Sequence, residues 1–125
     1  MTEFKERKAR SEWIKFELET KELDPPVIEL RLSPIESITD VDSFDGTGKL
    51  KSFSEVVLMK AMSCVVEWDI KQNEKLLPIE DLEIKERVLR RLLGEHLKGK
   101  KDEKRKLLGN AIIEYSTNLE NFLKN

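Results

Sequence analysis

Apolar and charged residues alternate in two segments near the N-terminus of the chain. In residues 12–20 the inward positions would be Ile14, Phe16 and Leu18, and in residues 27–32 they would be Ile28, Leu30 and Leu32. A period of two is typical of a strand with one buried face. The intervening Asp24-Pro25-Pro26 excludes helix and favours a turn. The pattern therefore predicts a β-hairpin in which residues 12–20 pair with residues 27–33.

Helix start signals follow the hairpin. Ser33-Pro34-Ile35-Glu36 and Ser52-Phe53-Ser54-Glu55 are capping boxes, in which a serine oxygen and a glutamate carboxylate satisfy free amides of a first helical turn. They predict helices at 34–42 and 53–68. The second helix should turn these residues inward: Phe53, Val56, Val57, Cys64, Val65 and Trp68.

Two further helices are predicted in the C-terminal half. Pro78 suits the first turn of a helix at 79–97, whose apolar stripe consists of Val88, Leu89, Leu92, Leu93 and Leu97. A last helix at 102–123 carries an apolar seam formed by Leu108, Ile112, Tyr115, Leu119 and Phe122. The expected fold is α+β, mainly α. A charged N-terminal arm at 1–11 precedes a single domain at 12–125, in which the hairpin at 12–33 is followed by about four helices packed as a small bundle. Val65 and Leu92 should be core positions.

Composition limits the classes of protein that fit. The chain has 125 residues, enough for one domain, and its 38% of charged residues suit solvated helix faces or an interaction protein. A net charge of −2 disfavours a wholly basic nucleic-acid binder. There is no signal-peptide pattern, and the longest apolar stretch, Val56–Val66, is interrupted by Lys60 and is too short to span a bilayer. The lone Cys64 suits a reducing compartment, so we expect a cytoplasmic protein.

No residue pattern points to catalysis, a cofactor or a metal. The acidic segment Asp40–Gly46 departs from the ligand spacing of a calcium loop. Gly46-Thr47-Gly48-Lys49 is too short for a phosphate-binding P-loop. His96 is the only histidine and has no cysteine cluster to complete a zinc site. No motif places a serine or cysteine beside a base, so we expect a non-enzymatic protein.

Three features are candidates for contact with a partner. Trp13 faces away from the inward side of the hairpin, so either the N-terminal arm covers it or it is offered to a partner. The seam at 102–123 either packs wholly on the protein's own helices or forms, in part, a contact with a second copy or a partner helix. The basic cluster Lys98–Lys106 is interrupted by Asp102 and Glu103, so we favour a solvated link over a nucleic-acid site.

The segment Val65–Asp81 resembles the mid-chain joint of the tail assembly chaperones of long-tailed bacteriophages. Its Val65-Val66-Glu67-Trp68-Asp69 and its Leu77-Pro78 look like the V-x-x-W-D/N and L-P motifs of that family, where the joint is expected to connect two helices. Ile28–Pro34 looks like the family's entry to its first helix. The resemblance extends loosely from Trp13 to Leu97, whereas the long charged C-terminal helix and the many lysines depart from the family's pattern.

The resemblance implies a non-enzymatic chaperone that binds the tape-measure protein and assists tail tube assembly. Such a protein is made in the cytoplasm of a bacterial host that carries the phage or prophage, and it is absent from the mature virion. The tail tube protein and a second copy of the chain are further expected partners. A small domain with apolar seams can cover the apolar stripes of a helical tape-measure protein. The alternatives are a DNA-associated helical regulator and another small helical adaptor.

Overall fold

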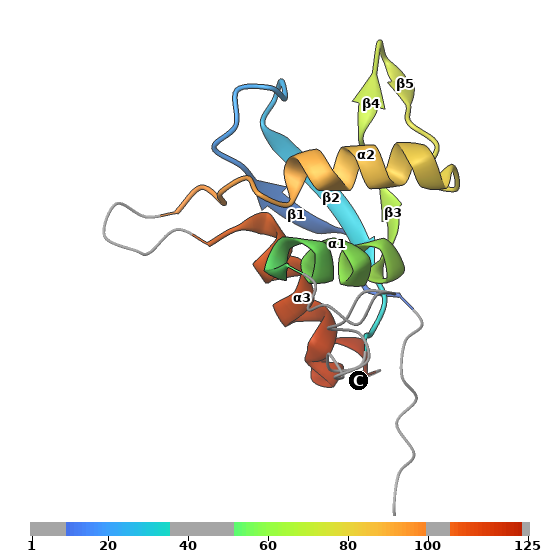
Figure 1. Ribbon diagram of the computed structural model, residues 1–125, viewed down its shortest axis with the longest axis vertical. Coiled ribbons are helices and arrows are strands. Elements are labelled where there is room, and N and C mark those ends of the chain that lie inside the picture. Colours follow the sequence, from blue (N-terminus) through green and yellow to red (C-terminus); the bar gives the residue numbers. More distant parts are fainter. Residues whose placement is uncertain (1–9, 36–51, 100–105, 124–125) are drawn as a thin grey trace, which may run out of the picture.

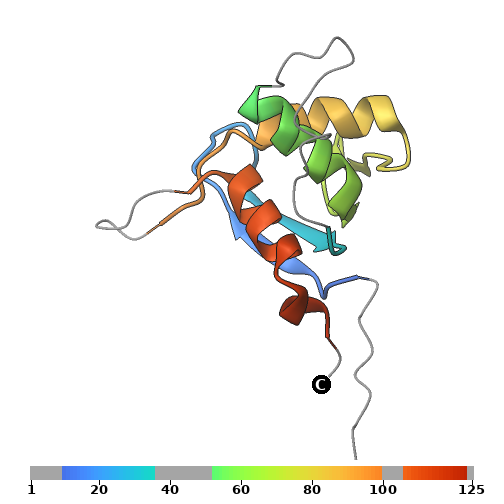
Figure 2. The ribbon, with the colours of Figure 1, turned by 60° about the horizontal axis from the view of Figure 1, so that its bottom comes forward.

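The computed structural model describes residues 10–35, 52–99 and 106–123, and it places the helices on one face of an antiparallel sheet (Figure 1, Figure 2). The described elements, in chain order, are β1 (Ile14–Glu17), β2 (Val27–Leu32), α1 (Phe53–Cys64), β3 (Val65–Trp68), β4 (Lys71–Gln72), β5 (Lys75–Leu76), α2 (Leu82–Leu92), α3 (Leu108–Thr117) and the 3₁₀ helix η2 (Leu119–Phe122). The main sheet has the order β1-β2-β3, and β4 and β5 form a separate hairpin. The predicted mainly α bundle is therefore wrong, since 40% of the described residues are helical and 25% are in strands.

The predicted N-terminal hairpin is confirmed. β1 pairs antiparallel with β2 in a register that sets Ile14 opposite Leu30 and Phe16 opposite Ile28. Every predicted inward side chain is buried except Ile14, which is half-buried, and the outward side chains of Lys15, Glu17 and Glu29 are exposed. The alternation therefore identified both the strands and the face that is covered.

α1 begins where the capping box predicts. The Ser52 hydroxyl accepts a hydrogen bond from the Glu55 amide at 3.3 Å. Phe53, expected to point inward, is instead 70% exposed, because it is the first helical residue and lies beyond the edge of the core. The other inward positions are buried as expected: Val56, Val57, Cys64, Val65 and Trp68.

The predicted continuation of this helix to Trp68 is wrong. Residues Val65–Trp68 form β3 and pair antiparallel with β2, with a bulge between Arg31 and Leu32. The Ser33 amide donates to the Cys64 carbonyl at 2.8 Å at the point where helix gives way to strand. Two consecutive β-branched valines favour the extended conformation once a neighbouring strand is available.

The segment expected to be a helix–turn–helix joint is a strand followed by a tight hairpin. After β3, β4 and β5 pair across a turn formed by Asn73 and Glu74. Both residues have positive φ, 52° and 65°, which is what a two-residue hairpin turn of type I′ requires. The hairpin projects beyond α2 (Figure 1).

Glu74→Gly is expected to stabilise the protein. A side chain in the left-handed region costs roughly 1–2 kcal/mol, and the greater chain entropy of glycine offsets about half of that gain. The midpoint of urea denaturation should therefore rise by an amount that corresponds to about 0.5–1 kcal/mol. Glu74→Ala keeps the Cβ and is the matched control, so it should give no such rise. An unchanged midpoint for the glycine variant would contradict strain at this turn.

α2 begins later than the predicted helix at 79–97. Asp81 is its N-cap, and its Oδ1 accepts hydrogen bonds from the amides of Glu83 at 3.1 Å and Ile84 at 3.2 Å. Pro78 therefore lies before the helix and not in its first turn. An aspartate cap also places a negative charge at the positive end of the helix dipole.

α2 also ends earlier than predicted. Beyond Leu92 the chain turns, and His96 and Leu97 form β-bridges with Leu107 and Leu18 respectively. These bridges continue the sheet beyond β1. They also provide hydrogen-bond partners for the backbone that follows α2. The predicted stripe still faces inward, with Leu89, Leu92 and Leu93 buried and Val88 and Leu97 half-buried.

The predicted helix at 102–123 is shorter and broken. α3 is followed by the 3₁₀ helix η2, and the Asn118 side chain caps η2 by accepting from the Glu120 amide at 3.2 Å. Residues 102–105 lie outside the described residues, and Lys106 and Leu107 precede the helix. The helix therefore starts at Leu108 and not near residue 102.

Most of the predicted helix at 34–42 lies outside the described residues, as do Asp40–Gly46 and Gly46–Lys49. Its first two residues are described and are not helical. The Ile35 amide instead donates to the Ser116 carbonyl of α3 at 3.0 Å.

The core lies between the inward face of the sheet and the helices α1, α2 and α3. The expected core positions Val65 and Leu92 are 0% and 4% exposed, so both predictions are confirmed. The fully buried side chains come from every layer and include Leu30, Leu32, Ala61, Leu108 and Ile112.

A buried polar cluster joins the three helices. The Lys85 ammonium donates to the Met62 carbonyl in the last turn of α1 at 2.7 Å. Burial raises the pKa of the Cys64 thiol, although the Ser116 hydroxyl and the Lys85 charge oppose this shift. Burial likewise lowers the pKa of Lys85, which the charge of Cys64 opposes.

This cluster predicts a pH dependence of stability. The raised pKa of Cys64 means that the folded state keeps a proton that the unfolded state releases above its ordinary pKa of 9.0. The thiol's contribution to the free energy of unfolding is therefore complete below that pH and declines above it, by at most about 1.4 kcal/mol per pH unit. The lowered pKa of Lys85 has the opposite effect on the pH dependence of stability. Comparing wild type with Cys64→Ala, which both contain Lys85, isolates the contribution of the thiol. Urea titrations between about pH 8 and 10 should show the stability advantage of wild type shrinking; a constant difference would contradict the shift.

Candidate partner-binding surfaces

The predicted partner-binding seam at 102–123 is mostly interior. Leu108, Ile112 and Phe122 are 0% exposed, so a partner cannot reach them in the folded state. Tyr115 is half-buried and meets the Phe122 ring edge-on, with the centroids 5.6 Å apart. Leu119 is 41% exposed. The seam therefore offers Leu119 and part of Tyr115 to solvent.

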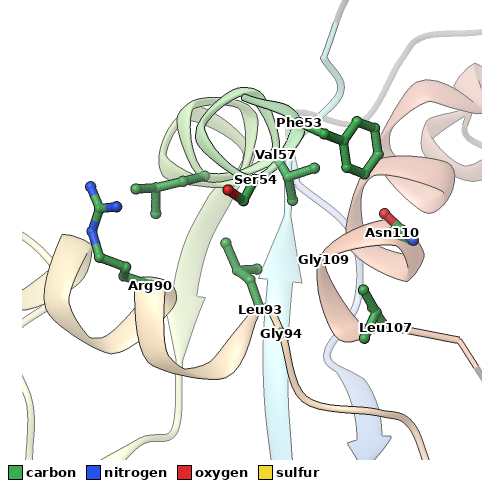
Figure 3. Close-up of a pocket in the computed structure, with 10 residues that line it drawn as sticks. Phe53, Ser54, Val57, Arg90, Leu93, Gly94, Leu107, Gly109 and Asn110 are labelled. Atoms are coloured by element: carbon green, nitrogen blue, oxygen red, sulfur yellow. The ribbon is translucent and has the colours of Figure 1, made fainter. Parts of the chain in front are cut away.

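An apolar groove opens where α1, the end of α2 and the start of α3 meet (Figure 3). This α1–α3 groove has a volume of about 300 Å³. Its walls include Val57, Leu93 and Leu107, and Figure 3 shows Phe53 and Arg90 at opposite sides of it. Neither the groove nor the exposed position of Phe53 was anticipated from the sequence.

The arginine at the rim of the α1–α3 groove is fully paired with carboxylates. The Arg90 guanidinium donates to Glu55 at 2.6 Å and to Glu86 at 2.8 Å. Because two carboxylates already accept hydrogen bonds from this guanidinium, Arg90 is not expected to bind an additional anion strongly. The groove is therefore suited to an apolar occupant.

Gly109 lets α3 approach α1 and α2 closely beneath this groove. Its amide donates to the Leu93 carbonyl at 3.0 Å. A Cβ at this position would lie 2.7 Å from Val57 Cγ1 and 3.2 Å from the Leu93 carbonyl oxygen. Side chains do not pack at such distances, so glycine is required here for steric reasons.

Gly109→Ala should destabilise the protein by about 1–3 kcal/mol, because the added methyl group forces the helices apart. Gly94→Ala is the matched control, since a Cβ there would meet nothing within 4 Å. Thermal unfolding followed by circular dichroism should separate the two variants. Equal melting temperatures would contradict the close approach at Gly109.

Trp13 is 46% exposed on the outer face of the sheet. The Arg31 guanidinium carbon lies 6.0 Å from the centre of its ring, within the range of a cation–π contact. Residues 1–9 of the arm that was considered as a cover lie outside the described residues. Within the described part of the chain, Trp13 keeps nearly half of its surface accessible.

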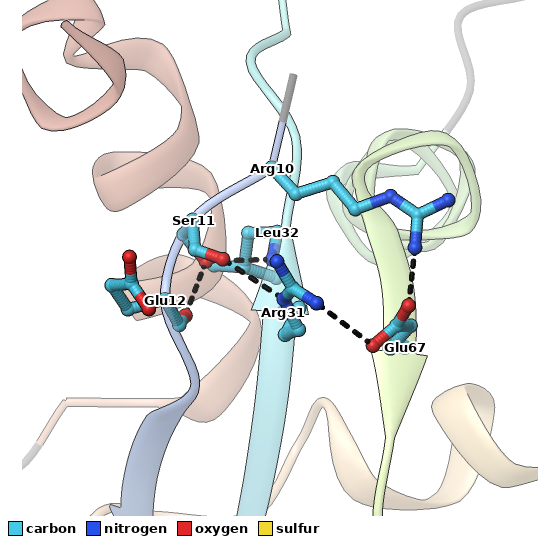
Figure 4. A network of polar contacts seen from close by, with 6 residues as sticks. All are labelled: Arg10, Ser11, Glu12, Arg31, Leu32 and Glu67. Atoms are coloured by element: carbon cyan, nitrogen blue, oxygen red, sulfur yellow. Dashed lines mark hydrogen bonds and ion pairs between the residues drawn. The ribbon is translucent and has the colours of Figure 1, made fainter. Parts of the chain in front are cut away.

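A polar network fixes the chain next to Trp13 (Figure 4). Arg31 Nε donates to the Ser11 carbonyl at 3.0 Å, and its Nη1 pairs with Glu67 at 3.4 Å. Glu67 also pairs with Arg10. The Ser11 hydroxyl accepts from the Leu32 amide at 2.9 Å, and Ser11 is 2% exposed. The last residues of the predicted arm are thus part of the folded structure and tie β1, β2 and β3 together.

The described residues hold no group of three or more histidine, cysteine, aspartate or glutamate side chains that could bind a metal ion. His96 is half-buried at its bridge to Leu107. None of the helices in the described ranges combines the length and the apolar character needed to cross a bilayer.

Comparison with known proteins returns no match. No family model fits the chain, and no significant relative is found among curated proteins or solved structures. The resemblance to tail assembly chaperones therefore stands on the sequence motifs alone.

Proposed function

We propose that this protein is a phage tail assembly chaperone that binds helical segments of a tape-measure protein until the tail tube forms. The observation that carries the proposal is the α1–α3 groove, with Phe53 70% exposed beside it. An exposed aromatic ring next to an apolar groove can anchor the apolar face of an amphipathic helix. The sequence motifs around Trp68 and Pro78 support the same function as sequence patterns, whereas the segment that carries them folds as β3 and the β4–β5 hairpin and not as a joint between two helices.

The charges of the protein fit this role. Arg90 is paired with Glu55 and Glu86, so apolar side chains can enter the groove without leaving that cation unpaired. The 38% of charged residues in the chain keep a complex with an otherwise aggregating helix in solution. In this function the protein acts in the bacterial cytoplasm and is absent from the mature virion.

Coexpression with the tape-measure protein of the same tail gene cluster tests the proposal. We expect the tape-measure protein to pellet when expressed alone and to form a soluble complex, measured by size-exclusion chromatography with light scattering, when the chain is present. Phe53→Asp should weaken capture by about tenfold or more, because it places a charge at the apolar anchor.

Leu82→Asp is the matched control. Leu82 is 68% exposed, as accessible as Phe53, but it lies at the other end of α2 from the groove. It should leave capture unchanged, and circular dichroism should show both variants folded. A tape-measure protein that stays insoluble with wild-type chain would refute the function. Equal capture by both variants would show that the groove is not the binding surface.

A further inference from the structure

A second groove lies on the other flank of α2, between that helix, β4 and the loop joining β1 to β2. This α2–β4 groove has a volume of about 400 Å³. Leu23, Leu77 and Val88 are half-buried in its lining, so apolar surface is accessible inside it. Such surface gains free energy when an apolar side chain covers it.

The rim of the α2–β4 groove is positively charged. Among the described residues, its lining contains Lys71, Arg87 and Arg91 and one carboxylate, Glu22, in a chain whose net charge is −2. Glu22 binds Arg91 through two hydrogen bonds, of 2.7 and 2.5 Å, which fix that guanidinium in place. No carboxylate among the described residues forms an ion pair with Lys71 or Arg87.

Arg87 differs in this respect from the other arginines of α2. Arg90 has two carboxylate partners and Arg91 has one. Arg87 and Arg91 stand four residues apart on one face of α2, and among the described residues no ion pair joins Arg87 to Glu83, the carboxylate four residues before it. An anion bound at Arg87 would reduce the repulsion between Arg87 and Arg91. It would also give Arg87 a negatively charged partner, as Arg90 and Arg91 already have.

The charge reverses at the other end of the groove. An adjoining hollow of about 380 Å³ shares Glu22, Leu23 and Lys71 with it and adds Asp24 and Asp69. Arg87 and Arg91 therefore place most of the positive charge on the α2 side, and Lys71 of β4 is the cation that lies between the two hollows. An acidic occupant is directed toward Arg87 and away from the loop.

We propose that the α2–β4 groove binds a segment of another protein in which an acidic side chain adjoins an apolar one. The carboxylate accepts hydrogen bonds from Arg87 and Lys71, and the apolar side chain packs on Leu77 and Val88. This surface is separate from the α1–α3 groove and does not depend on the chaperone function. Its affinity falls with rising salt, because the charges at the rim are exposed.

Fluorescence anisotropy with two labelled peptides of equal length tests this inference. One peptide repeats Leu-Glu-Glu and the other repeats Leu-Lys-Lys. We expect wild-type chain to bind the acidic peptide at least about tenfold more tightly, and Arg87→Glu to abolish that preference or reverse it. Lys15→Glu makes the same change of charge on the outer face of the sheet and should leave the preference intact. Phe53→Asp should also leave it intact, which separates this surface from the α1–α3 groove.

Three results would overturn the inference. The first is equal affinity of wild type for the two peptides. The second is a loss with Lys15→Glu as large as that with Arg87→Glu, which would indicate general attraction and not a site. The third is self-association of wild type that Arg87→Glu disrupts, measured by light scattering at the assay concentration, which would make a second copy the occupant.

Discussion

Phe122→Ala should lower the free energy of unfolding by about 3–5 kcal/mol, because it deletes a buried aromatic ring and leaves a cavity. Phe122 is 0% exposed and makes the edge-on contact with Tyr115 at 5.6 Å. It ends the last described helix, so its loss should release η2 from the core. Urea denaturation followed by tryptophan fluorescence measures the change.

Leu119→Ala is the control from the same seam. Leu119 is 41% exposed, and its truncation should change stability by less than about 1 kcal/mol. This contrast decides between the two interpretations of the seam. A Phe122→Ala variant that kept wild-type stability but no longer captured the tape-measure protein would contradict the core interpretation. It would instead support the seam as a partner-binding surface.

The parts of the fold that were predicted correctly rest on local physics. In β1 and β2 the alternation of apolar and charged residues has no helical interpretation, so strand type, pairing and inward face all followed from it. The start of α1 followed from Ser52 because a capping side chain bonds to amides within one turn. Neither inference needed knowledge of distant contacts.

The error at β3 has a non-local cause. Cys64, Val65 and Trp68 fit one face of a helix as well as they fit a short buried strand, and periodicity cannot separate the two in so short a segment. The open edge of β2 decides the outcome, because it offers Val65–Trp68 backbone partners that lie far away in sequence. Extending the helix across this segment also hid the β4–β5 hairpin, although Asn73 is a residue that tolerates positive φ.

The candidate surfaces were harder to predict than the fold. The α1–α3 groove combines residues from α1, α2 and α3, and the α2–β4 groove depends on the unexpected hairpin. One signal was present in the sequence. Gly109 interrupts an otherwise good helix pattern, and a glycine in such a position often marks a close approach of backbones. It marks the place where α3 meets Val57 and Leu93.

Trp68→Ala should lower the free energy of unfolding by about 3–5 kcal/mol, since it removes a large side chain from the core. Trp68 is 3% exposed, and its indole Nε1 donates to the Leu77 carbonyl at 2.8 Å. The indole thus contributes apolar burial. Its hydrogen bond also connects the end of β3 to Leu77, which follows the β4–β5 hairpin. Denaturation by urea, monitored by circular dichroism, gives the total effect.

Trp68→Phe separates these two contributions, because it keeps most of the apolar burial and deletes the donor. We expect a loss of about 1–3 kcal/mol, since the Leu77 carbonyl then loses its partner. Amide hydrogen exchange adds a local readout. The amide of Leu77, which donates to the Ile70 carbonyl at 2.9 Å, should exchange faster in Trp68→Phe, while amides of the β1–β2 hairpin exchange as in wild type. If Trp68→Phe matched wild type in both measurements, the indole hydrogen bond would not hold the hairpin. The tryptophan of the Val65–Asp81 motif would then contribute through apolar burial alone.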